Sequence, residues 1–175
     1  MRKTYALAAL LILAACNTPQ TGSAPVNAST KDTLPYPFKA TYSSDITVPG
    51  SAQVAHEVLD VWKAFESNDI KSKRASFADT VVYDDASGFR FNGPADSLLA
   101  FAGQDIRDLD SLRFDISAWQ SAHVNDKNQD WVNIWSTERR YPKKGKPDTS
   151  LIQENWMVAN GKIVYFNQFK AHLPK

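Results

Sequence analysis

Hydrophobic and polar residues alternate through most of the C-terminal part of the chain, and this pattern constrains the fold more than any other feature. A period of two places successive side chains on opposite faces of a β-strand. The alternation fills four long segments, each followed by a short polar or glycine-containing turn or by the chain end: 112–124, 131–141, 150–158 and 162–170. Long strands joined by such turns predict an antiparallel meander.

The segment before these strands has the periodicity of α-helices. Apolar residues recur every three or four positions from Val54 to Phe65, and Ser51 suits the N-cap of that helix. Further elements are expected after it: a short helix at 70–77, strands at 80–83 and 89–91, and a third helix from 93 onward. Helices followed by an antiparallel meander predict an α+β domain whose helices cover one face of a curved sheet.

The composition is that of a globular protein, and it excludes several classes of function. Hydrophobic residues make up 43% and charged residues 22% of the 175 residues, unlike a disordered chain. The 20 basic and 19 acidic residues leave a net charge of +1, so no nucleic-acid partner is expected. One Cys and three isolated His residues give no pattern for a disulfide framework or a metal site. The sequence has neither a phosphate-binding loop nor the Gly-x-Ser-x-Gly motif of a nucleophilic serine. No cofactor is expected.

The N-terminus has the features of a secretory signal. Met1-Arg2-Lys3 is basic, and the apolar run from Tyr5 to Ala15 is shorter than the roughly 20 residues that span a bilayer. The run ends in Leu13-Ala14-Ala15-Cys16, which resembles the lipobox of bacterial lipoproteins. The resemblance implies that Cys16 is lipidated and becomes the first residue after cleavage. The alternative is an ordinary signal peptide followed by a coincidental Cys.

These features divide the chain into three parts. Residues 1–15 are expected to be the signal peptide, 16–45 a lipidated flexible tether, and 46–175 the folded domain. The tether is rich in Ser, Thr, Pro and Ala and lacks apolar periodicity. Asn17 follows the Cys where many inner-membrane lipoproteins carry Asp, so the resemblance implies an outer-membrane anchor facing the periplasm. The lipid bilayer, reached through Cys16, is therefore an expected partner.

Three segments of the domain stand in a characteristic order: 77–83 (Phe-Ala-Asp-Thr-Val-Val-Tyr), 93–98 (Gly-Pro-Ala-Asp-Ser-Leu) and 160–164 (Asn-Gly-Lys-Ile-Val). Together with the order of helices and strands, they resemble the NTF2-like superfamily, which includes SnoaL-like cyclases and ketosteroid isomerases. The resemblance implies about three N-terminal helices on a curved, mostly antiparallel sheet of four to six strands. In that superfamily the sheet wraps into a cone with a ligand pocket at its mouth, and the members range from enzymes to binding proteins and transport factors.

The resemblance places Asp85 where the ketosteroid isomerases keep their base, on a gapless alignment from Phe77. At the mouth of an apolar cone, desolvation would raise the pKa of this carboxyl group and suit it to proton abstraction. The alternative is that residues 84–88 (Asp-Asp-Ala-Ser-Gly) are simply a turn, in which Asp accepts local backbone hydrogen bonds.

Glu154 is the second candidate, because it shares a strand face with Trp156. If that face is concave, Glu154 is a carboxyl group inside an aromatic cavity, where it needs a partner. The resemblance places it near the second acid of the isomerases, although a shift of one residue would put Gln153 there. In the alternative, Glu154 faces outward and pairs with Arg139 or Arg140.

His123 is the third candidate, because imidazole can act as an acid or a base near neutral pH. The alternative is a structural or solvated histidine. The helix-one tyrosine of the isomerases falls at about Val61, which has no hydroxyl group, so steroid isomerase activity is not expected. Tyr83 is a candidate substitute for that hydroxyl group.

Aromatic side chains are concentrated in the predicted sheet. A pocket for a flat or lipidic ligand would draw on seven of them: Trp62, Tyr83, Trp119, Trp131, Trp135, Trp156 and Phe166. In the alternative, most of these rings fill the core, or one Trp-rich face forms a homodimer contact through the sheet.

Three functional hypotheses follow from the sequence. The first is a membrane-anchored lipoprotein whose domain binds a small, mostly apolar ligand. The second is a cofactor-independent isomerase, cyclase or dehydratase that uses Asp85 with Glu154 or His123. The third is a protein–protein interaction scaffold.

Overall fold

The computed structural model describes residues 37–173. The predicted signal peptide, Cys16 and most of the predicted tether lie outside these residues. A compact unit begins at Ala40 and contains the helices and strands described here. None of the described helices is long and apolar enough to cross a membrane.

The secondary structure follows the predicted order, with longer strands than expected. The helical segments are α1 (Ala52–Glu66), the 3₁₀ segment η1 (Ile70–Ser76), α2 (Ala95–Asp105) and the single 3₁₀ turn η2 (Asn125–Lys127). The strands are β1 (Ile46–Thr47), β2 (Phe77–Asp85), β3 (Arg90–Pro94), β4 (Leu109–Val124), β5 (Gln129–Pro142), β6 (Asp148–Ala159) and β7 (Lys162–His172).

The strands form one sheet in the order β1-β4-β5-β6-β7-β2-β3. Only β2 and β7 are parallel neighbours among the described strands; the other pairs are antiparallel. The α+β class and the mostly antiparallel sheet are therefore confirmed. The sheet has seven strands instead of four to six, because the two-residue strand β1 also pairs with the end of β4. A segment of two residues is too short to show any alternation in the sequence.

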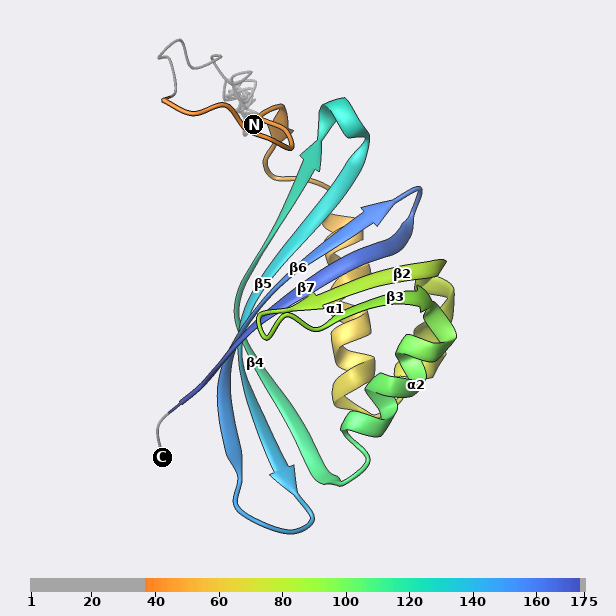
Figure 1. Ribbon diagram of the computed structural model, residues 1–175, viewed down its shortest axis with the longest axis vertical. Helices are drawn as coiled ribbons and strands as arrows, with labels where there is room; N and C mark the ends of the chain where they lie inside the picture. Colours follow the sequence, from red (N-terminus) through yellow and green to blue (C-terminus); the bar gives the residue numbers. More distant parts are fainter. Residues whose placement is uncertain (1–36, 174–175) are drawn as a thin grey trace, which may run out of the picture. The chain divides into compact units, whose positions relative to one another are not determined.

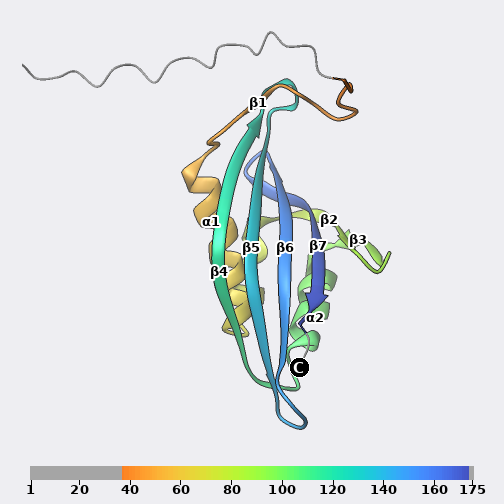
Figure 2. The same cartoon turned by 90° about the vertical axis from the view of Figure 1, so that its left-hand side faces the viewer.

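The helices cover one side of the sheet, as predicted. Figure 1 shows α1 and α2 on the same side of the long strands, and Figure 2 shows the other side, where β4 to β7 lie in front of the helices. Register shifts between Ile116 and Ala118 and between Met157 and Val158 interrupt the ladders of the long strands. Such bulges bend strands and increase their twist, which helps the sheet curve around the helices.

Helix α1 begins and ends where the sequence predicts. The Ser51 hydroxyl accepts a hydrogen bond from the Val54 amide at 3.3 Å, which satisfies one free N–H of the first turn. After the last turn Asn68 has a φ of 56°, a left-handed conformation that Asn tolerates and that ends the helix. The apolar face of α1, including Val58, Val61 and Trp62, is buried against the sheet.

Helix α2 begins at Ala95, two residues after the expected start at residue 93. Pro94 is the N-cap and not the first helical residue, because β3 extends through it. The buried residues of α2 are Ala95, Leu98 and Leu99, whereas Phe101 is half exposed. Phe101 instead stacks on Phe89 at a centroid distance of 6.0 Å.

The alternation in β5 shows which face of the sheet is concave. Val132, Ile134 and Ser136 are buried under the helices, whereas Trp131 and Trp135 alternate with them on the outer face. The sequence predicts both faces of this strand but leaves open which one meets the helices.

Candidate functional site

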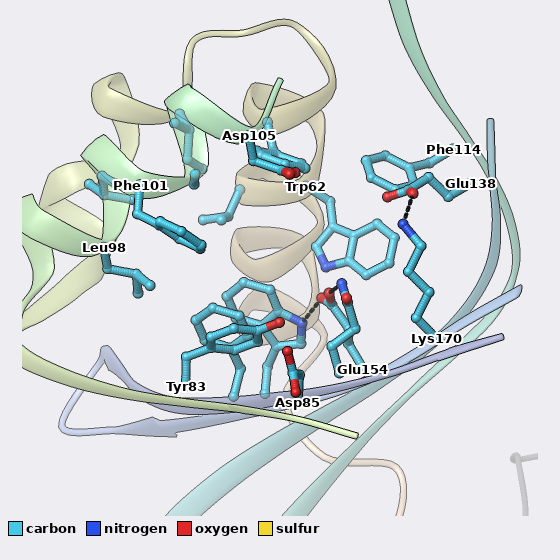
Figure 3. Close-up of a pocket in the computed structure, with 18 of the residues that line it drawn as sticks. Trp62, Tyr83, Asp85, Leu98, Phe101, Asp105, Phe114, Glu138, Glu154 and Lys170 are labelled. Carbon is cyan, nitrogen blue, oxygen red and sulfur yellow. Dashed lines mark hydrogen bonds and ion pairs between the residues drawn. The ribbon is translucent and has the colours of Figure 1, made fainter. Parts of the chain in front are cut away.

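A cavity of about 360 Å³ lies between the helices and the concave face of the sheet. This volume lies within the range of small-molecule pockets, which begins at about 300 Å³. Figure 3 shows side chains from α1, α2 and the strands pointing into it. Aromatic residues are the largest group in the wall: Trp62, Phe65, Phe77, Tyr83, Phe89, Phe101, Phe114, Trp156 and Phe166 line the cavity.

Three of these rings form a row across neighbouring strands. Phe166 of β7 lies opposite Trp156 of β6 and beside Tyr83 of β2 in the strand register. The Trp156 and Phe166 rings stack at 4.2 Å with an angle of 5° between their planes, and Tyr83 packs on Phe166 at 4.7 Å. Because each ring is held by a strand and by its neighbour, this wall of the cavity is pre-formed.

Four of the seven predicted ligand-binding aromatics line the cavity, namely Trp62, Tyr83, Trp156 and Phe166. The other three do not, and this part of the expectation is corrected: Trp119, Trp131 and Trp135 do not line it. Trp131 and Trp135 lie on the outer face of β5, and 56% of the Trp119 side chain is exposed. Trp131 and Trp135 have the opposite strand parity to the buried residues of β5, so they cannot reach the cavity. Trp119 lies opposite the buried Ile134 in the register, but it stands at an exposed position outside the cavity wall.

Glu154 points into the cavity, and the outward alternative is not observed. The residue is only 6% exposed, and its two carboxylate oxygens accept hydrogen bonds from Trp156 Nε1 at 2.8 Å and Gln168 Nε2 at 2.7 Å. Arg139 pairs with Asp115 instead, and Arg140 does not contact Glu154. Desolvation by burial raises the pKa of Glu154 from its ordinary value of 4.5 to about 7, although the hydrogen bonds from Gln168 and Trp156 oppose that rise.

Trp62 contributes a buried donor beside Glu154. Its side chain is 5% exposed, and its indole N–H has no hydrogen-bond partner among the described residues. The same N–H is close enough to the Glu154 carboxyl group to oppose the rise of its pKa (Figure 3). A buried donor without a partner is uncommon in folded proteins, and it marks this wall of the cavity as a place where an acceptor is stabilised.

Asp85 lies at the end of β2 and lines the same cavity, but its environment is that of a turn. One carboxylate oxygen accepts hydrogen bonds from the Ser87 amide at 2.8 Å, the Ser87 hydroxyl at 2.5 Å and the Phe89 amide at 3.1 Å. These bonds, that of the Ser87 hydroxyl above all, hold the pKa of Asp85 below its usual value. The expected rise of this pKa by desolvation is therefore wrong, because local donors stabilise the ionised form.

His123 lies away from the cavity. It pairs with Thr47 of β1 in the strand register, and its Nδ1 is 2.9 Å from the Asp130 carboxylate. It does not line the cavity, so the structure brings Asp85 and Glu154 together but not His123. Among the described residues, no group of three or more His, Cys, Asp or Glu side chains has the geometry of a metal site.

A charged cluster in the cavity wall was not predicted from the sequence. Glu138 is 2% exposed and pairs with Arg140 Nε at 2.7 Å and Lys170 Nζ at 2.5 Å. Arg140 also binds Asp105 at the end of α2, at 2.6 Å. Glu138 and Arg140 continue the inward-facing positions of β5. The alternation would therefore have placed both in the cavity wall if the inward face had been known from the sequence.

No protein-family model and no curated protein sequence matches the chain. Solved structures do match its fold. An LEH-like epoxide hydrolase of Mycobacterium tuberculosis aligns with a TM-score of 0.57 at 12% identity, over 69% of this chain and 84% of that one. An NTF2-like protein of unknown function from Burkholderia pseudomallei K96243 has a TM-score of 0.54 at 18% identity, over 67% and 90%. A candidate SnoaL-like polyketide cyclase from Shewanella putrefaciens CN-32 has a TM-score of 0.54 at 10% identity, over 70% and 80%.

These matches confirm the predicted NTF2-like fold, a curved sheet closed by N-terminal helices around a cavity. At such identities they show the fold alone, and proteins of one fold differ widely in activity. The function has to be argued from the residues of the cavity.

Proposed function

On the basis of this NTF2-like fold, we propose that the domain binds a small, mostly apolar molecule in the cavity between α1, α2 and the concave face of the sheet. The observation that carries the proposal is the cavity volume of about 360 Å³, which the aromatic side chains surround but do not fill. Empty apolar space forfeits packing contacts, so a domain without a ligand would gain stability by filling it.

The polar groups of the cavity also support a binding site. Ligand pockets are mainly apolar and carry a few polar groups that fix the orientation of the ligand. Here the Trp62 indole, the Tyr83 hydroxyl group and the Glu154 carboxyl group occupy one side of the cavity, and Figure 3 shows the three converging. Burial, with the nearby Glu154 and Asp85 charges, raises the pKa of the Tyr83 phenol, so it remains a neutral donor.

Native mass spectrometry tests the proposal on the full-length protein purified from its own host. We expect a reproducible small-molecule adduct that disappears on denaturation and that the purification reagents do not explain. Ala102→Trp should lose the adduct, because Ala102 lines the cavity and the indole would occupy its space. Ala118→Trp, at an exposed position of β4, is the matched control and should keep it. A wild-type spectrum without an adduct, or an adduct retained by Ala102→Trp, would contradict the proposal.

A second candidate function is acid–base catalysis without a cofactor, and the pKa of Glu154 favours it. A carboxyl group with a pKa of about 7 is able to take up and release a proton near neutral pH. Asp85, in contrast, is held ionised at the rim by its turn. The recovered ligand, incubated with the protein in D₂O and then returned to H₂O, would keep a gain in mass if a C–H proton is exchanged, and Glu154→Gln should stop that gain. If the ligand binds but no proton is exchanged, the ligand-binding proposal stands and the proposal of acid–base catalysis is contradicted.

We also propose that the chain is held at a membrane through Cys16, in an outer membrane and facing the periplasm. The support is the lipobox-like sequence at 13–16 and the polar composition of the segment up to residue 45. Acyl chains contribute about 0.8 kcal/mol of membrane affinity per buried CH₂ group, so several chains together anchor a protein stably. Cys16→Ser should move the chain from the membrane fraction to the soluble fraction, and Ser23→Ala should not. Retention of Cys16→Ser in membranes after a high-salt wash would contradict this location.

A further inference from the structure

We infer that the ligand of this cavity is an organic cation, an amine or quaternary ammonium ion on an apolar body, and that Glu154 is its counter-ion. The inference rests on the proposed ligand-binding function and adds the charge of the ligand. It follows from the numbers of acidic and basic side chains in the cavity wall and from the position of Glu154, the buried carboxyl group that has no basic partner there.

The cavity wall carries more acidic than basic side chains. Two basic residues, Arg140 and Lys170, line it. The acidic residues that line it are Asp85, Asp105, Glu138 and Glu154. The wall therefore has an excess of two carboxyl groups before any ligand is bound, and low-dielectric walls strengthen the field of such an excess inside a cleft.

The two basic side chains are already neutralised. Lys170 binds Glu138, and Arg140 binds both Glu138 and Asp105, with N–O distances between 2.5 and 2.7 Å. Figure 3 shows the Glu138–Lys170 pair beside Phe114, away from the Glu154 carboxyl group. Two cations thus share two carboxylates, and this cluster has no positive charge to offer Glu154 or a ligand.

Glu154 has hydrogen-bond donors but no basic partner among the described residues. Trp156 and Gln168 each donate to one of its oxygens, and the free Trp62 N–H lies next to it. All three donors are neutral, so they favour the ionised carboxylate without cancelling its charge. Burying a carboxylate with no cation is costly, and the cavity provides the space in which a cation would remove that cost.

The surrounding rings suit the same ligand. The faces of aromatic rings carry partial negative charge and attract ammonium groups within about 6 Å of the ring centre. Phe166 is stacked between Trp156 and Tyr83 in the row of rings beside Glu154, so the faces left for a cation are the outer faces of Trp156 and Tyr83. Figure 3 shows Tyr83 and Asp85 on the same side of the cavity as Glu154. Asp85, ionised at the rim, would attract a cation toward the entrance.

The inference predicts how binding changes with pH. The titratable or charged groups that face Glu154 are Tyr83 and Asp85 of β2, Asp105 of α2, Glu138 and Arg140 of β5, and Lys170 of β7. Because the pKa of Glu154 is about 7, the fraction of ionised Glu154 rises about tenfold between pH 6 and pH 8. A cation should therefore bind about tenfold more tightly at pH 8 than at pH 6.

Isothermal titration calorimetry of the full chain with three probes tests the inference. Benzyltrimethylammonium carries a permanent charge, so only the protein titrates in this comparison. Neopentylbenzene is its neutral isostere, and phenylacetate is an anion on a similar ring. We expect the cation to bind more tightly than both other probes at pH 8, and its affinity to be about tenfold lower at pH 6.

Two variants connect the preference to Glu154. Glu154→Gln keeps the size of the side chain and should weaken cation binding at pH 8 at least about tenfold, because a close charge pair is lost, and should abolish the pH dependence. Glu57→Gln makes the same chemical change on α1, outside the cavity wall. It should change neither the affinity for the cation nor the pH dependence of binding. The pH dependence of the wild-type chain is an independent measurement, so the test survives if Glu154→Gln does not fold.

Several outcomes would overturn the inference. Equal binding of the cation and its neutral isostere at both pH values would show a ligand site without charge preference, and the proposed binding function would stand. A preference for phenylacetate would assign the site to anions held by Arg140 or Lys170. If no probe binds, the organic-cation inference fails, and the native mass spectrum decides separately whether the cavity holds another ligand.

Discussion

The free energy of unfolding of this protein is expected to fall by about 2 to 3 kcal/mol between pH 5 and pH 8, because of Glu154 alone. The folded-state pKa of Glu154 is about 7, and its ordinary value is 4.5. Between these two values the folded chain keeps a proton on Glu154 that the unfolded chain has released. Raising the pH through this window therefore favours the unfolded state, which is the opposite of the behaviour of a carboxylate stabilised by a salt bridge.

Glu154→Gln isolates this contribution. The amide has no charge to desolvate, so the variant should lose this part of the pH dependence and unfold at a higher urea concentration than the wild type at pH 8. Glu57→Gln, on the outer part of α1, should retain the wild-type slope. Urea unfolding followed by circular dichroism at pH 5, 6, 7 and 8 gives all three slopes. Equal slopes in the wild type and Glu154→Gln would show that Glu154 is not desolvated in the folded chain.

The stability cost and the proposed ligand have the same origin. The fold places a carboxyl group where its ionised form is unfavourable without a cation, and it surrounds that group with neutral donors. A bound cation would lower the pKa of Glu154 and return part of the lost stability at neutral pH, because binding to the folded state adds to the free energy of unfolding. The domain would then be most sensitive to its ligand above pH 7.

Most of the fold could be predicted from the sequence because its long elements follow local rules. The period of two marks β4 to β7, and the spacing of apolar residues together with the Ser51 cap marks α1. The two-residue strand β1 could not be predicted, because it exists only through its pairing with the end of β4. The extension of β3 through Pro94 also depends on pairing, since Pro94 lies opposite Thr80 in the register.

The site was harder to predict, because the alternation gives two faces of a strand and does not say which is concave. In β5 both faces carry large residues, with Trp131 and Trp135 on one and Val132 and Ile134 on the other. The packing of α1 selects the second face, and that choice brings Glu138 into the cavity and removes the two Trp residues from it. A choice made by tertiary packing is not encoded in the period of a single strand.

The pKa of Asp85 illustrates a different limit. Its position at the cavity rim was predicted, but the sign of its shift depends on three donors within four residues. The sequence Asp-Ala-Ser-Gly contains the signal for such a turn, because Asp commonly accepts hydrogen bonds from the backbone that follows it. The local hydrogen bonds lower the pKa of Asp85 by more than burial raises it, although the resemblance implied a pKa raised by burial.

Trp156→Ala is expected to destabilise the domain by about 3 to 5 kcal/mol, the range for truncating a buried aromatic residue. Trp156 is 5% exposed, stacks on Phe166 and packs against Phe77 with a centroid distance of 6.4 Å. Its loss would also remove one of the two hydrogen bonds to Glu154, and the pKa of Glu154 would then rise further. Urea unfolding measures the stability change, and Trp156→Phe should retain most of the packing while losing the N–H donor.

Trp119→Ala is the matched control, because the same side chain is removed from an exposed position on β4. Trp119 is 56% exposed, so Trp119→Ala should change the free energy of unfolding of the single chain by no more than about 0.5 kcal/mol. If Trp119→Ala costs as much as Trp156→Ala, and the cost grows with protein concentration, the sheet carries a homodimer contact in solution. The aromatic residues outside the cavity would then have the interface role that the sequence left open.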